Sequence, residues 1–388
     1  MNEIPFNRPF TSGREFIYVR EAIENGHLSA SGPFTDRCSR WLEQRIGNEQ
    51  VLLTHSCTAA LEMMAMLLEI GPGDEVVMPS FTFVSAANAV VVRGGRPVFV
   101  DIRPDTLNID ETSVRAAITP RTKAIVVVHY AGVGCAMNEL ASIAEETGTA
   151  LIEDAAHGIL ASYEDRPLGS FGPLAALSFH ETKNVHCGEG GALLINESAY
   201  RERAEILLDK GTNRRRFFRG QVDKYTWVDI GSSYALSDIN AAFLWAQLEE
   251  AEPITARRLE IWARYHEAFA GLEEQGIARR PVTPGDCSHN AHVYYLLLPD
   301  LDSRSRLIAD LREVGIHAVF HYVPLHGSDA GRRYGRQAGD LTVTEDASER
   351  LVRLPLWPGM TDGEVERVID AVNSACTLIA GRLPARFN

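Results

Sequence analysis

Between residues 51 and 195, short apolar runs alternate with segments of helical pattern, and this alternation limits the folds that the chain can adopt. The expected strands are Val51–Thr54, Glu75–Pro79, Pro97–Asp101, Ala124–His129, Thr149–Glu153, Leu174–Phe179 and Gly191–Ile195. Their apolar character is continuous, which is typical of strands that are buried on both faces. The alternation predicts an α/β fold with a mostly parallel sheet covered by helices on both sides. Ligands are expected beyond the carboxyl ends of the strands.

The pattern outside this region is mainly helical. Helices are expected at 14–25, 36–46, 58–69, 84–93, from 110, 138–147, 237–250, 254–272, 304–314 and 362–379, with two more strands at 292–298 and 317–320. The proline at position 253 separates two of these helices. We therefore expect a large domain over residues 1–252, with a helical N-terminal segment, and a smaller C-terminal α+β domain over residues 253–388.

The composition excludes several classes of partner. The net charge of −14 argues against nucleic acid or an anionic membrane as the main partner. No apolar run approaches the roughly 20 residues of a membrane-spanning helix, and residues 1–10 lack the layout of a signal peptide. The six cysteines are scattered without a C-x-x-C pair, which fits reduced thiols in a cytoplasmic protein and predicts no metal site.

The chain holds few lysines, and one of them stands out by its position. Lys and Arg total 38, and the only lysines among them are Lys123, Lys183, Lys210 and Lys224. Arginine stays protonated, whereas a desolvated lysine can lose its proton and attack a carbonyl group. Only Lys183 follows an apolar strand and leads into a glycine-rich segment, Gly188–Gly191. Lys183 is therefore the candidate amine nucleophile, and a solvated loop cation is the alternative.

Three other strand ends carry side chains that suit a flat, charged ligand. Ser56-Cys57-Thr58 begins an expected helix, where free N–H groups and the helix dipole favour a phosphate; an ordinary helix cap is the alternative. Asp154 ends a buried strand, and a protonated pyridine nitrogen would offset the cost of its burial; a structural ion pair or a cap is the alternative. Phe83 would supply a stacking surface for a conjugated ring, with core filling as the alternative.

An anion site, an aromatic ring, a strand-end carboxylate and an amine thus occur in chain order, each at the end of a strand of one sheet. Pyridoxal 5'-phosphate requires this set, because it needs a phosphate site, a ring platform, a partner for its pyridine nitrogen and a lysine. The combination is far more specific than any one of its members. The sequence therefore indicates pyridoxal 5'-phosphate as the cofactor.

Five segments carry a resemblance to a known family. They are Ser178–Asn184, Gly211–Arg214, Phe217–Trp227, Asp229–Tyr234 and Val319–Gly327, which read SFHETKN, GTNR, FFRGQVDKYTW, DIGSSY and VFHYVPLHG. Through them the chain resembles the sugar-nucleotide aminotransferases of the DegT/DnrJ/EryC1/StrS family, nearly from end to end. The resemblance implies fold type I, the aspartate-aminotransferase class, with a sheet of the seven-stranded type. Within the family it is strongest to the enzymes that form dTDP-4-amino-4,6-dideoxygalactose.

The resemblance also implies roles for the residues of the cofactor site. Lys183 would bind the cofactor covalently and then move a proton, Asp154 would pair with the pyridine nitrogen, and Phe83 would stack on the ring. His157 would contact the ring hydroxyl, where many relatives carry glutamine. Ser56, Cys57, Thr58 and Ser178 would bind the phosphate, although many relatives read Ser-Gly-Thr at positions 56–58. Ser233 stands where many relatives place an asparagine that reaches over from a second subunit.

The substrates follow from the resemblance as well. It implies L-glutamate as the amino donor, dTDP-4-dehydro-6-deoxy-D-glucose as the acceptor, and a homodimer with shared active sites. Asn184, Arg219, Lys224 and His326 are the candidate substrate-binding residues. A 3-keto or UDP-linked sugar is the alternative substrate. A non-catalytic regulatory protein and a dehydratase of the same fold are the rival classes. The presence of Lys183 argues against both, and dehydratase relatives carry histidine at this position.

Overall fold

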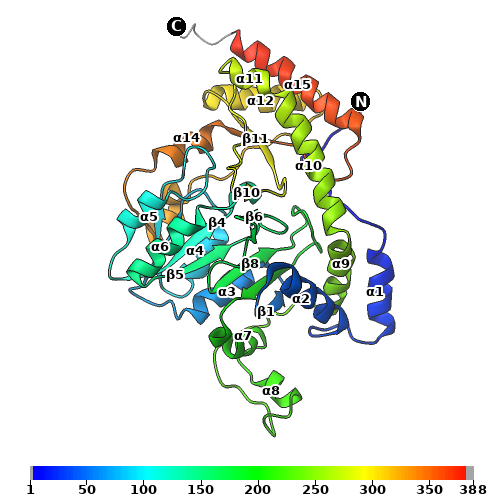
Figure 1. Ribbon diagram of the computed structural model, residues 1–388, viewed down its shortest axis with the longest axis vertical. Helices are drawn as coiled ribbons and strands as arrows, with labels where there is room; N and C mark the ends of the chain where they lie inside the picture. The colour runs from blue at the N-terminus through cyan, green and yellow to red at the C-terminus, as the bar shows by residue number, and fades with distance from the viewer. Residues whose placement is uncertain (1–2, 382–388) are drawn as a thin grey trace.

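A sheet of eight strands forms the centre of the computed structural model, which describes residues 3–381 (Figure 1). Its strands in spatial order are β1 (Gln50–Thr54), β9 (Gly191–Ile195), β8 (Leu174–Ser178), β5 (Ala150–Asp154), β4 (Thr122–Val128), β2 (Glu75–Pro79), β3 (Arg96–Val100) and β12 (Arg336–Gln337). Only β9 runs antiparallel to its neighbours in this sheet. The predicted α/β fold with a mostly parallel sheet is confirmed. Residues 1, 2 and 382–388, at the outer ends of the two expected domains, lie outside the described residues.

Helices cover both faces of this sheet because successive strand residues point to opposite sides. One face packs against α3 (Cys57–Leu67), α4 (Val84–Val91) and α7 (Arg201–Leu208). The opposite face packs at one end against α1 (Glu15–Glu24), α2 (Pro33–Ile46) and α9 (Asp238–Glu249), and at the other end against α5 (Glu111–Ala117) and α6 (Met137–Thr147). In β1, for example, Leu52 joins the first core whereas Val51 and Leu53 join the second. The continuous apolar runs in the sequence arise from this burial on two sides.

A second core lies at the other end of the molecule (Figure 1). It is built from α10 (Ala251–Ala268), α11 (Ala270–Glu274), α12 (Leu301–Glu313), α15 (Asp362–Ala380) and the antiparallel pair β11 (Tyr294–Leu297) and β13 (Leu351–Leu354). Ile4 from the N-terminal segment joins it and bridges Ile316. One residue separates α9 from α10, and Pro253 lies in the first turn of α10. The division at residues 252 and 253 stays a prediction.

Two details of the C-terminal part differ from the sequence-based expectation: one predicted strand is wrong, and the short strand β12 was not predicted. The predicted strand at residues 317–320 is wrong, because Val319 forms only an isolated bridge to Arg353 while β11 pairs with β13. The remaining elements are α8 (Arg214–Phe218), α13 (Asp329–Tyr334), α14 (Thr342–Arg350), β6 (Ser162–Tyr163), β7 (Arg166–Pro167) and β10 (Cys287–Ser288).

The short strand β12 was also not predicted, and it joins the C-terminal part of the chain to the edge of the large sheet. It pairs in parallel with β3. Beside this pair Arg336 donates to both carboxylate oxygens of the buried Glu75, at 3.0 and 2.8 Å. These hydrogen bonds from Arg336 lower the pKa of Glu75 to about 2, although burial opposes them. The two parts of the molecule are thus linked by backbone pairing and by a bidentate ion pair.

The topology brings several functional segments to one edge of the sheet. β1, β2, β5 and β8 all end at this edge, and the antiparallel β9 begins there. The chain therefore places the start of α3, Phe83, Asp154 and the loop with Lys183 around one opening. This is the edge at which ligands bind in parallel α/β sheets.

Candidate active site

A cavity of about 500 Å³ lies at the carboxyl edge of the sheet, between the sheet and the C-terminal part of the chain. The predicted cofactor-site residues that line it are Ser56, Cys57, Thr58, Phe83, Asp154, His157, Ser178 and Lys183. They come from four loops that are far apart in the sequence. The structure therefore brings together nearly the whole set on which the cofactor prediction depends.

Lys183 lies half-buried in the loop that connects β8 to β9. The loop is held by backbone hydrogen bonds from Lys183 to His180 (2.9 Å) and from Cys187 to Phe179 (2.9 Å). Burial lowers the pKa of Lys183 to about 8, against the opposing attraction of Asp154. A desolvated amine of this kind is a nucleophile at a pH where an ordinary lysine is protonated.

This lowered pKa predicts how the apoprotein should capture its cofactor. With a pKa near 8, about a tenth of the Lys183 amines are neutral at about pH 7 and about nine-tenths at about pH 9. The rate of covalent attachment of pyridoxal phosphate, followed by absorbance, should rise with pH and level off above about pH 9. Nα-acetyl-lysine measured alongside corrects for the titration of the cofactor itself. A rate that keeps rising through about pH 10.5, as for an ordinary lysine, would contradict the prediction.

The start of α3, which is the expected anion site, lies at the cavity. Ser56 is the N-cap, and its Oγ accepts a hydrogen bond from Ala59 N–H at 3.1 Å. The N–H groups of Cys57 and Thr58 follow in the first turn, where a helix has no internal acceptors for them. A Cβ on Gly191 would lie 2.4 Å from Cys57 N, so only glycine lets β9 begin against this turn. Ser56 therefore acts as a cap, while the turn after it presents N–H groups to an anion.

Asp154 and His157 place polar groups in the wall of the cavity. The Asp154 carboxylate is 6% exposed and accepts a hydrogen bond from Ala156 N–H at 3.1 Å. Within residues 3–381 it forms no ion pair, and burial raises its pKa. Nδ1 of His157 is buried without a partner, and burial keeps the pKa of this ring well below its usual range. A pyridine nitrogen would give Asp154 a charged partner and a ring hydroxyl would give His157 Nδ1 a hydrogen bond, so the residues fit pyridoxal phosphate.

Phe83 and Ser178 complete this side of the cavity. Phe83 directly precedes α4 and is 59% exposed, so its ring face is available for stacking. Ser178 ends β8, and its Oγ accepts a hydrogen bond from His180 N–H at 3.4 Å. The hydroxyl groups of Thr58 and Ser85 pair at 2.7 Å beside the start of α3. The roles assigned to these residues stay predictions.

Asn184 is not among the lining residues and instead positions one of them. It is 3% exposed, and its Nδ2 donates to Asn290 O at 2.8 Å. Its Oδ1 lies 3.1 Å from His292 Nδ1, which therefore carries the proton. The His292 ring stacks on His157, with 4.0 Å between the ring centroids. Asn184 thus connects the Lys183 loop to the histidine that packs against His157.

The other candidate substrate residues lie outside the cavity of this chain. Arg219 ends α8 and forms a bidentate ion pair with Glu205, at 3.0 and 2.7 Å. Lys224 is exposed in the following loop, and Ser233 lines a separate groove. His326 contacts Ser80 Oγ at 2.7 Å and Glu345 at 3.3 Å. Their roles in substrate or cofactor binding stay predictions.

Several lining residues were not anticipated from the sequence. The C-terminal part of the chain contributes Arg258, His292, His321, Tyr322 and Arg353 to the cavity. His321 and Tyr322 belong to a segment that carried the family resemblance, in which His326 was selected instead. Arg353 interrupts the apolar run Leu351–Leu356, and a charge within such a run was the available signal.

No helix within residues 3–381 combines the length and apolarity needed to cross a membrane. Nor does that part of the chain contain a cluster of three His, Cys, Asp or Glu residues that could hold a metal ion.

The fold and the site define a pyridoxal-phosphate-dependent enzyme of fold type I. Comparison with known proteins identifies the family: residues 11–373 match the DegT/DnrJ/EryC1/StrS aminotransferases, and the chain belongs to this family. The enzyme is thus a pyridoxal-phosphate-dependent aminotransferase.

Solved structures of other aminotransferases are similar to this protein over nearly the whole chain. The aminotransferase TlmJ from Streptoalloteichus hindustanus is 32% identical, with a TM-score of 0.89 over 97% of this chain and 100% of its own. The PLP form of the sugar aminotransferase Spr1654 from Streptococcus pneumoniae, described as putative, is 26% identical, with a TM-score of 0.89 over 97% and 99%. DesV from S. venezuelae, solved in complex with a ketimine intermediate, is 28% identical, with a TM-score of 0.88 over the full length of both chains.

Each residue of the cavity has a different predicted role in the reaction. When bound, the cofactor supplies an electron sink for the carbon that carries the amino group. Lys183 provides the amine and can hold or release a proton near pH 8. Asp154 would keep a ring nitrogen protonated, and the first turn of α3 would hold the phosphate. The neutral His157 is placed to contact the ring without adding charge.

Proposed function

We propose that this enzyme aminates a nucleotide-linked keto sugar. It transfers the amino group of L-glutamate to carbon 4 of dTDP-4-dehydro-6-deoxy-D-glucose, which yields dTDP-4-amino-4,6-dideoxy-D-galactose and 2-oxoglutarate. The observation that carries the proposal is the cavity in which Lys183, with its lowered pKa, shares the wall with Asp154 and the start of α3. Similarity to a sugar aminotransferase supports a sugar as acceptor, and the segments 178–184 and 319–327 support the dTDP-linked 4-keto sugar.

The proposal has two half-reactions that use the same cavity in turn. L-glutamate first gives up its amino group and leaves as 2-oxoglutarate, and the keto sugar then takes its place and accepts the amine. A volume of about 500 Å³ is within the range of small-molecule sites. Lys183 would serve as the acid or base in both halves. The amino sugar would be made in the cytoplasm and used in a surface polysaccharide or glycolipid.

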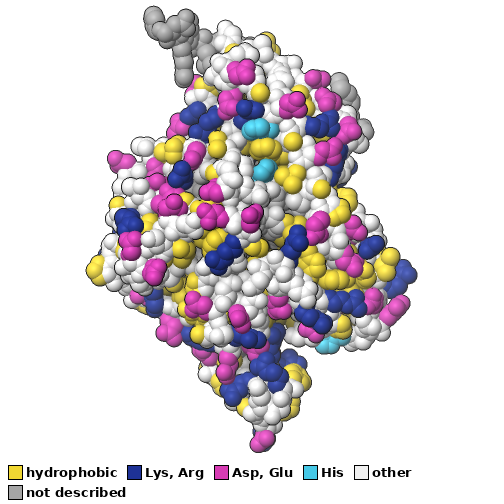
Figure 2. All heavy atoms as spheres, in the orientation of Figure 1, with side chains coloured by type: hydrophobic (Ala, Val, Ile, Leu, Met, Phe, Trp, Pro, Cys, Tyr) yellow, Lys and Arg dark blue, Asp and Glu magenta, His cyan; other side chains and the backbone are white. Residues whose placement is uncertain are grey.

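A homodimer with shared active sites is part of the proposal. Its support is the lobe that carries α8, which projects from the lower end of the molecule (Figure 1). Trp227, Phe218 and Tyr225 on this lobe are 77%, 68% and 52% exposed. Basic side chains gather on this lobe, as Figure 2 shows, and α8 contributes Arg214, Arg215 and Arg216. Exposed aromatic rings on a single chain are typical of a protein interface.

A panel of keto-sugar nucleotides tests the substrate. The holoenzyme with L-glutamate should aminate dTDP-4-dehydro-6-deoxy-D-glucose faster than the UDP-linked 4-keto sugar or a dTDP-linked 3-keto sugar. NMR of the product should show the amino group at carbon 4 in the galacto configuration. If the enzyme prefers a 3-keto or UDP-linked sugar, that sugar replaces the proposed substrate. If glutamate removes the absorbance band of the cofactor but none of the sugars is aminated, the proposal of a sugar acceptor is overturned.

A further inference from the structure

Two segments that are distant in the sequence meet beside the Lys183 loop, and a buried asparagine ties them together. Asn290 is 0% exposed, and its Nδ2 donates to His157 O and to Ile159 O, both at 2.7 Å. Its Oδ1 accepts from His292 N–H at 3.1 Å. The amide uses both of its donors and its acceptor in this way, so it fixes the backbone of His157 against that of His292.

The side chain of His292 is held as firmly as its backbone. Arg258 is 2% exposed and donates to Ala291 O at 3.1 Å and to His292 O at 2.6 Å. The Nδ2 group of Asn184 donates to Asn290 O, so its Oδ1 is left to accept the proton of His292 Nδ1. The ring is therefore in the neutral Nδ1–H form, and burial keeps the pKa of His292 well below its usual range.

The ring of His157 packs on this fixed imidazole. The two rings stack with 4.0 Å between their centroids and 26° between their planes. Tyr130 contacts the same ring edge-on, with 6.3 Å between the centroids. Burial lowers the pKa of both imidazoles, and the positive charge of Lys183 lowers them further. Both rings are thus neutral, and the plane of the His157 ring is set by its neighbours.

This support is needed because a histidine does not fix the plane of its own ring. The χ2 torsion of histidine is broad, whereas a hydrogen bond weakens steeply when its angle departs from linearity. The buried Nδ1 of His157 has no partner, and a hydroxyl group can meet it only in the plane of the imidazole. The stack therefore determines whether such a hydrogen bond can form.

We propose that His292, held by Asn184, is a positioning residue that fixes the His157 ring for the ring hydroxyl of pyridoxal phosphate. The inference depends on the cofactor and on the predicted contact of His157 with the hydroxyl. It goes beyond the proposed function, because it does not depend on which sugar is aminated. It also gives Asn184 a place in cofactor binding, where the sequence predicted a contact with the substrate.

Two analogues that cannot react with Lys183 test the proposal in the apoprotein. The analogue 4-deoxypyridoxine 5'-phosphate keeps the ring hydroxyl but has no aldehyde, and the corresponding compound without the hydroxyl is its partner. Calorimetry should show that the wild type binds the hydroxyl analogue about fivefold more tightly, as expected for one added hydrogen bond. His292→Leu should lower this ratio to about one, because the His157 ring is then free to turn.

Three further variants separate positioning from general support of the site. His292→Phe keeps a flat ring against His157 and should restore most of the ratio. Asn184→Leu releases the His292 ring and should give an intermediate ratio. His266→Leu is the matched control, because His266 is a stacked imidazole outside the cavity, 4.5 Å from the Trp262 ring centroid, and should leave the ratio unchanged.

The tautomer of His292 provides a readout that does not involve the cofactor. In the wild-type apoprotein labelled with ¹⁵N at histidine, NMR should show an Nδ1–H imidazole whose signal is missing in His292→Phe. In Asn184→Leu this ring should change to the Nε2–H form, because its acceptor is lost. An Nε2–H form of His292 in the wild type would contradict the role of Asn184.

The outcomes separate this inference from the proposed function. If the wild type binds both analogues equally, His157 makes no contact with the hydroxyl and the inference is wrong. If His292→Leu weakens both analogues by the same factor, His292 only supports the structure and the inference is again overturned. If His292→Leu fails to fold, the ratio for Asn184→Leu decides. If the ratio depends on His292 but no keto sugar is aminated, the positioning role stands and the proposed acceptor fails.

Discussion

Replacement of Lys183 by alanine is expected to lower turnover at least about 10³-fold, the largest effect on activity of any single substitution in the cavity. Proton transfer by a positioned side chain alone contributes about 10²- to 10⁴-fold, and the same amine is predicted to hold the cofactor as well. Among residues 3–381, no other lysine lines the cavity to replace it. Single-turnover absorbance with L-glutamate measures the loss, and mass spectrometry after borohydride reduction should locate the cofactor on Lys183 of the wild type.

Lys123→Ala is the matched control for this substitution. Lys123 lies at the start of β4, and its Nζ donates to Glu69 O at 2.7 Å, so it is remote from the cavity. Its replacement should leave turnover and the borohydride label unchanged. A Lys183→Ala protein that retains turnover, or a label on another lysine, would end the assignment of Lys183 as the catalytic amine.

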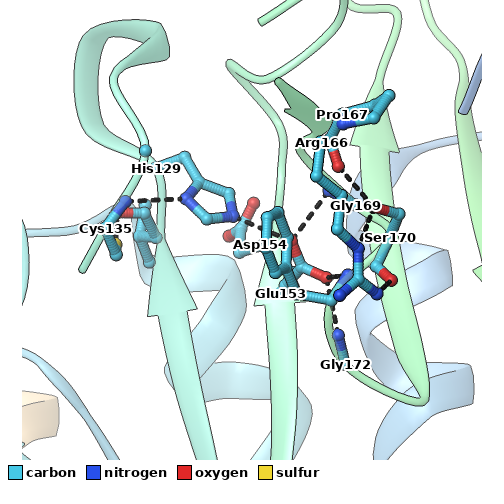
Figure 3. Close-up of polar contacts among 12 residues, drawn as sticks. His129, Cys135, Glu153, Asp154, Arg166, Pro167, Gly169, Ser170 and Gly172 are labelled. Atoms are coloured by element: carbon cyan, nitrogen blue, oxygen red, sulfur yellow. Dashed lines mark hydrogen bonds and ion pairs between the residues drawn. The ribbon is translucent and has the colours of Figure 1, made fainter. Parts of the chain in front are cut away.

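Replacement of Glu153 by alanine is expected to be the most destabilising substitution near the site, by about 3–5 kcal/mol. Glu153 is fully buried, and its carboxylate accepts hydrogen bonds from Gly169, Phe171 and Gly172 N–H at 2.8, 2.7 and 2.9 Å. His129 Nε2 donates to it at 3.0 Å, because His129 Nδ1 accepts from Cys135 N–H (Figure 3). Alanine would leave all these buried donors without an acceptor. Urea unfolding of the two proteins measures the difference.

The neighbouring carboxylate provides the control. Asp154 follows Glu153 on β5 but points into the cavity, where it accepts a hydrogen bond from Ala156 N–H. Asp154→Asn should change the unfolding midpoint little and reduce activity strongly, the reverse of Glu153→Ala. Equal unfolding midpoints for Glu153→Ala and the wild type would show that the hydrogen bonds to Glu153 do not stabilise the fold.

The sequence was sufficient for those parts of the site that depend on local pattern. Buried parallel strands have continuous apolar runs, and their carboxyl ends meet at one edge, so the positions of Lys183 and Asp154 followed from the order of the strands. The helix expected from residue 110 was also predictable, because Asp110 is a residue that favours the N-cap, and its carboxylate accepts from Ser113 N–H at 2.7 Å.

The features that could not be predicted from the sequence depend on contacts between distant segments. Arg353 enters the cavity because Phe320 and Phe6 hold it there, and neither contact has a local signature. Arg219 was selected as a substrate-binding residue, but its pairing with Glu205 is decided by how α7 and α8 pack. The error at residues 317–320 has the same origin, because the choice between two apolar segments as partner of β11 is made by tertiary packing.

The pairing of β12 with β3 has a consequence for the cavity. Exposed edge strands can pair with other chains, and β12 covers β3 along that margin of the sheet. Together with the ion pair between Arg336 and Glu75, it fastens the C-terminal part of the chain to the sheet. The cavity lies between the sheet and that part of the chain, so this attachment restrains the separation of its two walls.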